Sequence, residues 1–257
     1  MRWVKYKQVI ENFFSLSILN ALNVLLPLVT LPYMLHVVGK ANYGAYSYVY
    51  AVVQYVILFS TYGFNFSATK QISQCRDDKE KVSKIYNAVT ASKTLIALSL
   101  SVLLLCAKLV FKDGVGTLMF VYGLGMVIGD VLTPIWLFQG MEKMKYMTIV
   151  NASSKILFTI LIFIVVRASE DYQLLILLNS CGYLLAGVLS LILVCRQFHL
   201  RLHWATWSDI RMQLKEGSAV FGSTFGMNLY RNANVIILKQ FVSDDIVGLY
   251  SAAEKVI

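Results

Sequence analysis

The sequence predicts an all-α polytopic membrane protein, whose apolar helices cross a bilayer several times. Of its 257 residues, 58% are hydrophobic and 14% are charged, whereas about 25% are charged in typical soluble domains. The mean hydropathy is +0.64, which is more apolar character than one buried core explains. The apolar residues also gather in runs of about 20 or more, the length that a helix needs to cross a bilayer. A soluble enzyme, a secreted disulfide domain and a disordered tail are therefore disfavoured.

The first crossing is predicted over residues 13–38, which contain no Asp, Glu, Lys or Arg. This run is too long for the apolar core of a cleaved signal peptide, and it contains Pro27 and Pro32, so we interpret it as a transmembrane helix. An eighth apolar segment opens at Ile246 and reaches Ile257, which is too short to cross. Between them, six further crossings are predicted, over residues 43–63, 86–107, 116–138, 147–166, 172–194 and 218–242.

The predicted helices suggest two lobes of unequal extent. Residues 1–216 are expected to form an N-terminal lobe of six helices, and residues 217–257 the truncated start of a C-terminal lobe, with one complete helix and part of the next. A short repeat at an offset of 204 residues is consistent with related lobes, because Gly44-x-Tyr-Ser recurs as Gly248-x-Tyr-Ser. Such a short match also arises by chance, so the sequence leaves an internal duplication open.

The distribution of Lys and Arg predicts that the N-terminus is cytoplasmic. Cytoplasmic loops of membrane proteins carry an excess of these residues. Four lie on one side of the predicted helices, at Lys40, Lys108, Lys112 and Arg167. Fourteen lie on the other side, at Arg2, Lys5, Lys7, Lys70, Arg76, Lys79, Lys81, Lys84, Lys143, Lys145, Arg196, Arg201, Arg211 and Lys215. Because topology accounts for the net charge of +9, we expect no nucleic-acid partner.

Three stretches of sequence resemble the Wzx-type O-antigen flippases. These belong to the multidrug, oligosaccharidyl-lipid and polysaccharide transporter superfamily. The stretches are residues 44–47 (GAYS), residues 62–69 (YGFNFSAT) and, most specific of all, residues 134–144 (PIWLFQGMEKM). The resemblance runs from about Leu26 to the end of the chain.

The resemblance implies a function and a location. Members of this superfamily have two six-helix lobes that face a central cavity, and the flippases move undecaprenyl-pyrophosphate-linked sugar units across the bacterial inner membrane by alternating access. We therefore expect a non-enzymatic protein without a cofactor, for which an H⁺ or Na⁺ gradient is the candidate energy source. Its expected partners are a lipid-linked oligosaccharide and membrane lipids, with other polysaccharide assembly proteins as further candidates.

Charged residues inside predicted crossings are candidates for the functional site, since each costs about 3 kcal/mol or more at the centre of a bilayer. Lys93, Asp130 and Lys155 are predicted to lie at one depth, where two cations and a carboxylate could hold an anionic head group and exchange a proton. The alternative is that the lysines reach toward the head groups of the lipids and that Asp130 pairs with one of them structurally. We assign Asp130 to ion coupling and the two lysines to substrate binding.

Arg231 is the leading candidate for binding the substrate. It lies deep in the predicted seventh crossing, and its planar guanidinium suits the oxygens of a pyrophosphate. A hydrogen bond to a neighbouring helix is its structural alternative. The side chains of Asn23 and Asn228 suit sugar hydroxyls, although hydrogen bonds between helices explain them equally well. No metal site is predicted, because His199 and His203 lack an intervening carboxylate motif.

Two other functions remain alternatives at this point. A multidrug-type exporter of the same superfamily would move substrates that have no lipid tail. A membrane-embedded polysaccharide enzyme is less favoured, because we find no cluster of carboxylates or histidines in the sequence that is typical of such a site.

Overall fold

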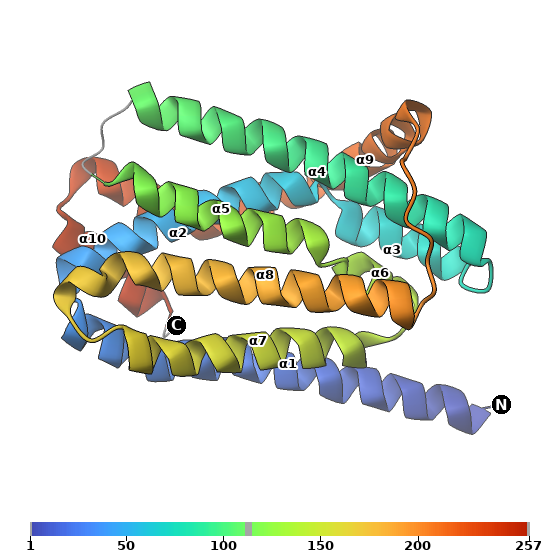
Figure 1. The fold of residues 1–257 in the computed structure, drawn as a ribbon, viewed down its shortest axis with the longest axis horizontal. Coiled ribbons are helices and arrows are strands. Elements are labelled where there is room, and N and C mark those ends of the chain that lie inside the picture. The colour runs from blue at the N-terminus through green and yellow to red at the C-terminus, as the bar shows by residue number, and fades with distance from the viewer. Residues whose placement is uncertain (1, 111–114, 256–257) are drawn as a thin grey trace.

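The chain folds into a bundle of long helices that run roughly side by side along its longest axis (Figure 1). The computed structural model describes the backbone of residues 2–110 and 115–255, and the side chains of residues 10–110, 115–222 and 233–255. No β-strand occurs within these backbone ranges. The prediction of an all-α protein is therefore confirmed.

Six stretches of the described residues are long and apolar enough to cross a membrane, which confirms a polytopic membrane protein. They coincide with the first six predicted crossings, whereas the predicted seventh crossing forms part of α9 and stays a prediction. The long helices are α1 (Arg2–Val37), α2 (Lys40–Thr61), α4 (Lys79–Val110), α5 (Thr117–Leu132), α7 (Met144–Val165), α8 (Tyr172–Arg196) and α9 (Trp207–Phe241). The shorter elements are α3 (Phe64–Gln74), α6 (Ile135–Gly140), η1 (Ser169–Asp171) and α10 (Asp244–Glu254).

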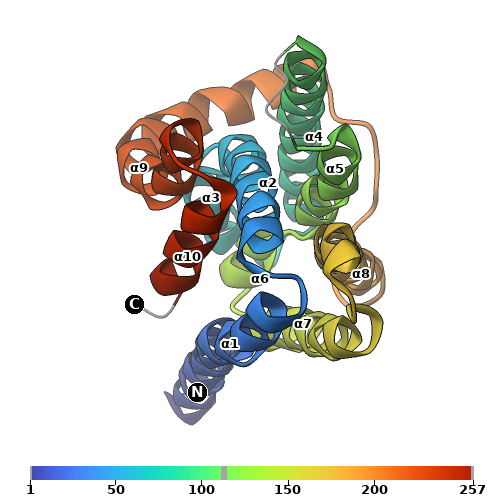
Figure 2. The same ribbon diagram turned by 90° about the vertical axis from the view of Figure 1, so that its left-hand side faces the viewer.

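The helices α2 and α10 begin at one end of the bundle, and Figure 2 views the molecule from that end. Helix α2 lies at the centre of this view, α9 and α10 lie on one side of it, and α4, α5 and α8 lie on the other. Helices α1 and α7 pair below them. We call the opposite end, which carries the loops at residues 75–78, 141–143 and 197–206, the basic end.

Two of the six apolar stretches, Lys40–Gln74 and Thr117–Gly140, are each broken into a long and a short helix. Between α2 and α3, Tyr62 and Gly63 adopt positive φ angles of 42° and 77°. The αL region accommodates glycine without strain, and a Cβ atom at Gly63 would also lie 2.9 Å from the carbonyl oxygen of Gly217. The turn therefore needs glycine both for its conformation and for the close approach of α9.

The second break, between α5 and α6, occurs at Pro134. Thr133 has an extended backbone with φ −98° and ψ 96°, as the residue before a proline prefers. Pro27 and Pro32 instead lie within the continuous helix α1. The predicted crossing at residues 116–138 is thus two helices that meet at an angle.

Residues 134–144, the most specific stretch of the family resemblance, form α6 and the turn that follows it at the basic end. Trp136, Leu137 and Phe138 are buried there. The turn is held by Arg76, whose guanidinium lies 2.6 Å from the Glu142 carboxylate and whose Nε donates to the carbonyl oxygen of Gly140 at 2.6 Å. This stretch therefore forms a packed corner that joins α3 to α6.

Helix α9 begins earlier than the sequence suggests, at Trp207 rather than near residue 218. The Thr206 side chain caps it by accepting a hydrogen bond from the backbone N–H of Asp209. The Thr206 hydroxyl and the Lys84 ammonium also hold the pKa of Asp209 below its usual value, because both favour the carboxylate. The predicted lobe boundary at residues 216 and 217 falls inside this helix, and the division into lobes stays a prediction.

The two copies of the Gly-x-Tyr-Ser repeat lie against each other where α2 crosses α10. A Cβ atom at Gly44 would clash with the carbonyl oxygen of Asp244, and one at Gly248 would clash with the carbonyl oxygen of Lys40. Positions 40 and 244 are also related by the offset of 204 residues. The same hypothetical atoms lie 3.0 Å from the backbone nitrogen of Gly248 and 3.2 Å from that of Gly44. Such reciprocal contacts are those of a local two-fold axis, and the internal duplication itself stays a prediction.

Glycines also permit the close packing of α5 against α8. A Cβ atom at Gly125 would lie 2.9 Å from the Ser180 Cβ, and one at Gly129 would lie 2.6 Å from the Leu184 backbone nitrogen. The spacing of these two glycines is that of the small-residue motif of membrane helices. In this chain the motif serves contacts within one molecule.

We predict that Gly44→Val separates α2 from α10. The valine would strike the backbone of α10, and overpacking of this kind costs about 1–3 kcal/mol. The matched control is Gly116→Val, because a Cβ atom at Gly116 meets nothing within 4 Å. The midpoint of thermal unfolding in detergent should fall clearly for Gly44→Val and for Gly248→Val but not for the control, and equal midpoints would contradict the close crossing.

Candidate functional site

A partly open cavity of about 380 Å³ lies among α1, α2, α5, α7 and α8. Apolar side chains line much of it. Its charged and amide-bearing lining residues are Asn23, Asp130, Asn151, Lys155, Asn179 and Lys255. A largely apolar cavity with a few convergent polar groups is the usual form of a ligand site. Two of the charged residues and one of the amides are residues that the sequence singles out.

Lys155 and Asn23 meet on one wall of this cavity. The Lys155 ammonium donates a hydrogen bond to the side-chain oxygen of Asn23, which joins α7 to α1. Asn151, one helical turn before Lys155, lines the same cavity. Since α1 and α7 lie side by side along the bundle (Figures 1 and 2), this cation is placed at their seam and faces the cavity.

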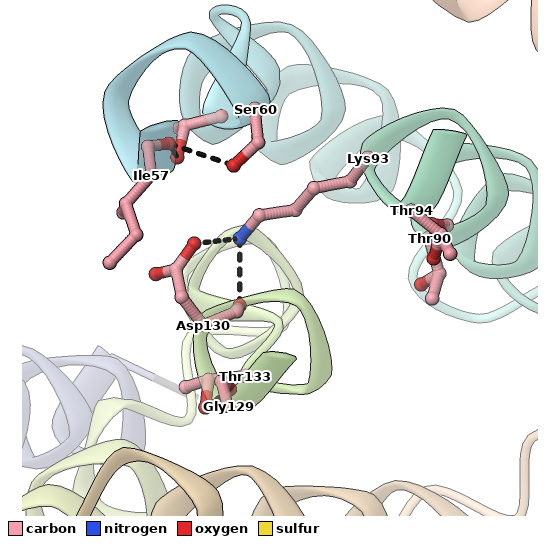
Figure 3. Close-up of polar contacts among 9 residues, drawn as sticks. Ile57, Ser60, Thr90, Lys93, Thr94, Gly129, Asp130 and Thr133 are labelled. Atoms are coloured by element: carbon pink, nitrogen blue, oxygen red, sulfur yellow. Dashed lines mark hydrogen bonds and ion pairs between the residues drawn. The ribbon is translucent and has the colours of Figure 1, made fainter. Parts of the chain in front are cut away.

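Asp130 is held by Lys93 from the side away from the cavity. The Lys93 ammonium lies 2.7 Å from the Asp130 carboxylate and also donates to the Asp130 backbone carbonyl at 2.7 Å (Figure 3). The Lys93 side chain is 5% exposed and that of Asp130 is 13% exposed. This is a buried ion pair that joins α4 to the end of α5.

The second contact of Lys93 repairs the helix at its break. Pro134 has no N–H, so the carbonyl of Asp130 lacks its usual helical donor. It accepts instead from Lys93 and, at 3.2 Å, from the backbone N–H of Thr133. The Thr133 hydroxyl in turn donates to the carbonyl oxygen of Gly129 at 2.8 Å. Side chains and backbone of the protein therefore satisfy these carbonyls.

The structure brings together only part of the predicted constellation. Lys93 and Asp130 form a pair, as the structural alternative predicts, while the ammonium of Lys155 is hydrogen-bonded to Asn23. Lys93 does not line the cavity, but Asn23, Asp130 and Lys155 do. The carboxylate thus pairs with Lys93 alone of the two lysines, and the assignment of these residues to substrate binding and ion coupling stays a prediction. Arg231 and Asn228 lie outside the residues whose side chains the structure describes.

Tyrosines are the part of the cavity wall that sequence reasoning missed. Tyr46 and Tyr50 of α2 line it together with Tyr183 of α8. The spacing of Tyr43, Tyr46 and Tyr50 on one helix is the signal that could have identified them, because residues three, four and seven apart share a helix face. Lys255 escapes the search for charges inside crossings, because the apolar segment that contains it is too short to be predicted as a crossing.

The cavity is electropositive. Among the described residues, Lys155 and Lys255 line it, and the one lining carboxylate, Asp130, is neutralised by Lys93. The described residues contain no group of three or more His, Cys, Asp or Glu side chains that could hold a metal ion. The arrangement suits an anionic ligand that also carries hydroxyl groups, because ammonium groups bind phosphate oxygens and amides bind hydroxyls.

An all-α bundle of apolar helices, with a cavity that carries a few polar groups, defines the chain as a polytopic membrane protein. The chain belongs to the family described as polysaccharide biosynthesis protein, whose pattern matches residues 9–257. The resemblance to the Wzx-type flippases is thereby confirmed.

Two curated relatives are provisionally named O-antigen transporters. The chain is 33% identical over 247 residues to the one from Escherichia coli (strain K12), and the match covers 96% of this chain and 60% of the relative. It is 28% identical over 246 residues to one from Shigella dysenteriae, with 95% and 62% covered. The chain thus spans about 60% of the length of the curated relatives that it matches. No solved structure matches the chain.

We predict that Lys93 and Asp130 depend on each other for stability. Lys93→Met strands a buried carboxylate and removes one of the two donors to the Asp130 carbonyl. The loss of one partner from such an ion pair costs about 3–5 kcal/mol. Lys93→Met with Asp130→Leu should be more stable than Lys93→Met alone. Thermal unfolding in detergent measures both, with Lys81→Met as the control, because Lys81 pairs with Asp78 at an exposed site. A double variant no more stable than the single one would refute the coupling.

Proposed function

We propose that this chain takes part in moving lipid-linked polysaccharide repeat units across the bacterial inner membrane, by alternating access rather than by an enzymatic reaction. The observation that carries the proposal is the electropositive cavity with Lys155 and amide groups on its wall, in a member of a polysaccharide biosynthesis family. The names of the two curated relatives support transport of O-antigen material. The names do not mention a lipid carrier, and the lipid-linked form of the substrate is part of our proposal.

The side chains of the cavity have complementary roles in this proposal. The Lys155 ammonium binds a phosphate oxygen of the carrier lipid, and Asn23 holds that ammonium in place when no substrate is bound. The amides of Asn151 and Asn179 offer both donors and acceptors, which sugar hydroxyls require. Many weak polar contacts of this kind tolerate a range of sugars, whereas the charge selects for the anionic carrier.

Asp130 is the candidate for coupling to an ion gradient. Its carboxylate lines the cavity while Lys93 approaches from the other side. A proton or a sodium ion that competes with Lys93 for this carboxylate would weaken the contact between α4 and α5. In this proposal the ion acts on the helix break at Pro134, because the same lysine also holds the Asp130 carbonyl.

A multidrug-type exporter is the alternative within the same superfamily. It would use the same cavity for substrates that lack a lipid tail. The two functions separate in a liposome assay, because only the flippase requires the lipid carrier for its sugar cargo to cross.

We predict that Lys155→Met lowers the export of polysaccharide about tenfold, since a hydrogen bond to a charged group contributes about 1.5–3 kcal/mol. Lys155→Arg should retain part of the activity because it keeps the charge. The measurement is surface O-antigen in a bacterium whose own transporter is deleted, with the membrane level of each variant quantified. Lys145→Met, at an exposed site outside the cavity, is the control, and normal export by an adequately expressed Lys155→Met would argue against the role of this cavity.

Arg231 is tested in the same assay. Arg231→Gln should reduce export strongly, and Arg231→Lys only partly, because lysine keeps the charge but loses the planar fork. Normal surface polysaccharide from Arg231→Gln would exclude an essential role for this residue in binding.

We also propose that the basic end is cytoplasmic, as the asymmetry of Lys and Arg predicts. In a variant whose four cysteines are replaced by serine, a new cysteine at Arg167 should react with a membrane-impermeant thiol reagent in cells with a permeabilised outer membrane. A cysteine at Arg201 should stay protected until the inner membrane is opened. Both positions are exposed, so the reverse pattern would invert the orientation.

A further inference from the structure

A cluster of three tyrosines on α2 surrounds the ammonium of Lys255. The Lys255 Nζ lies 5.3 Å from the ring centre of Tyr43 and 5.7 Å from those of Tyr46 and Tyr50. It also donates a hydrogen bond to the Tyr43 hydroxyl at 2.9 Å. These four residues, which we call the tyrosine cage, lie where the end of α10 meets α2.

The three rings form a continuous aromatic surface. Ring centres are 5.8 Å apart between Tyr43 and Tyr46 and 5.9 Å apart between Tyr46 and Tyr50. Tyr46, Tyr50 and Lys255 all line the cavity of the proposed transport site. Three of the four cage residues thus form part of one wall of the cavity, and Lys155 with Asn23 belongs to another, formed by α7 and α1.

Hydrogen bonds fix the polar edge of this surface. The Asn179 amide donates to the Tyr46 hydroxyl at 3.2 Å, and the Gln54 amide donates to the Tyr183 hydroxyl at 3.2 Å. Phenol and amide groups therefore lie beside the aromatic rings in a defined orientation. A sugar ring has matching chemistry, because its C–H groups carry slight positive charge toward the negative ring face, and its hydroxyls pair with phenols and amides.

We propose that the tyrosine cage is a subsite that stacks a sugar ring of the substrate, and that Lys255 occupies the cage when no sugar is bound. The proposal rests on the proposed function and names the part of the cavity that recognises the carbohydrate. Tyr46 is buried and Tyr50 is partly buried, so a sugar reaches their faces only when the ammonium leaves.

Displacement of Lys255 would link binding of the sugar to the contact between α10 and α2. Lys255 follows directly on α10, and its cation–π and hydrogen-bond contacts hold the end of that helix against α2. A sugar that takes the place of the ammonium removes those contacts. The binding of a sugar thereby loosens the contact between α2 and α10, where Gly44 packs against Gly248.

The test compares two ligands for the purified chain, in a detergent that has no sugar head group. One is undecaprenyl pyrophosphate, and the other is the same lipid bearing a single N-acetylhexosamine. The wild-type chain should bind the second more tightly. Tyr50→Leu should weaken binding of the sugar-bearing lipid about fivefold, the effect of an aromatic contact worth about 1 kcal/mol, and should leave binding of the sugar-free lipid unchanged.

Three further variants define the origin of that effect. Tyr50→Phe should bind like the wild type because it keeps the ring. Tyr55→Leu is the matched control, since Tyr55 lies on the same helix but does not line the cavity. Lys255→Met should bind the sugar-bearing lipid several-fold more tightly, because the competing ammonium is removed.

Each other outcome has a defined meaning. Equal binding of the two lipids to the wild type, or equal losses for Tyr50→Leu and Tyr55→Leu, overturns the sugar subsite and leaves the proposed function intact. Weaker binding of the sugar-bearing lipid to Lys255→Met overturns the competition. If neither lipid binds the wild-type chain, the proposed function fails and the subsite fails with it.

Discussion

The interrupted helix at Pro134 depends on the requirement that every backbone polar group inside a membrane find a partner within the protein. The proline removes one donor from the α5 ladder, and the carbonyls that it frees would each cost several kcal/mol in hydrocarbon. Lys93 and Thr133 supply the missing donors. One ammonium therefore serves a backbone carbonyl and a carboxylate together, and it ties α4 to the end of α5, where the chain turns into α6.

The interruption between α5 and α6 at Pro134 shapes the cavity and contributes to its charge. Because α5 ends at Leu132, the chain turns at Thr133 and Pro134 and packs Trp136 and Phe138 into the corner at the basic end. Asp130 is left at the cavity wall with its charge compensated from behind. The cation on the opposite wall, Lys155, has an amide rather than a carboxylate as its hydrogen-bond partner. The cavity is thus electropositive because Lys93, which lies outside it, pairs with the Asp130 carboxylate, while Lys155 on the cavity wall has no carboxylate partner among the described residues.

Much of the fold follows from the sequence, whereas the contacts of the site do not. The length of uncharged runs defines six crossings, because the bilayer requires about 20 apolar residues for each. The break at Pro134 is hidden within such a run, since a helix interrupted inside a protein keeps its apolar composition. Depth along a helix places Lys93, Asp130 and Lys155 at similar levels but says nothing of the direction in which each side chain points, so it could not show which lysine binds the aspartate. The tyrosine cage joins residues more than 200 positions apart, and no local pattern predicts such a meeting.

The reciprocal contact between Gly44 and Gly248 bears on how the two halves of such a protein diverge. After a duplication, each copy of a segment is free to change wherever it faces lipid or its own lobe. Where the two segments meet, however, each must fit against the other. A side chain added to Gly44 strikes the backbone of α10, and one added to Gly248 strikes the backbone of α2. Substitutions there are constrained in pairs. If the two segments arose by duplication, their similarity should therefore persist longest at this crossing, where the sequence Gly-x-Tyr-Ser is found in both.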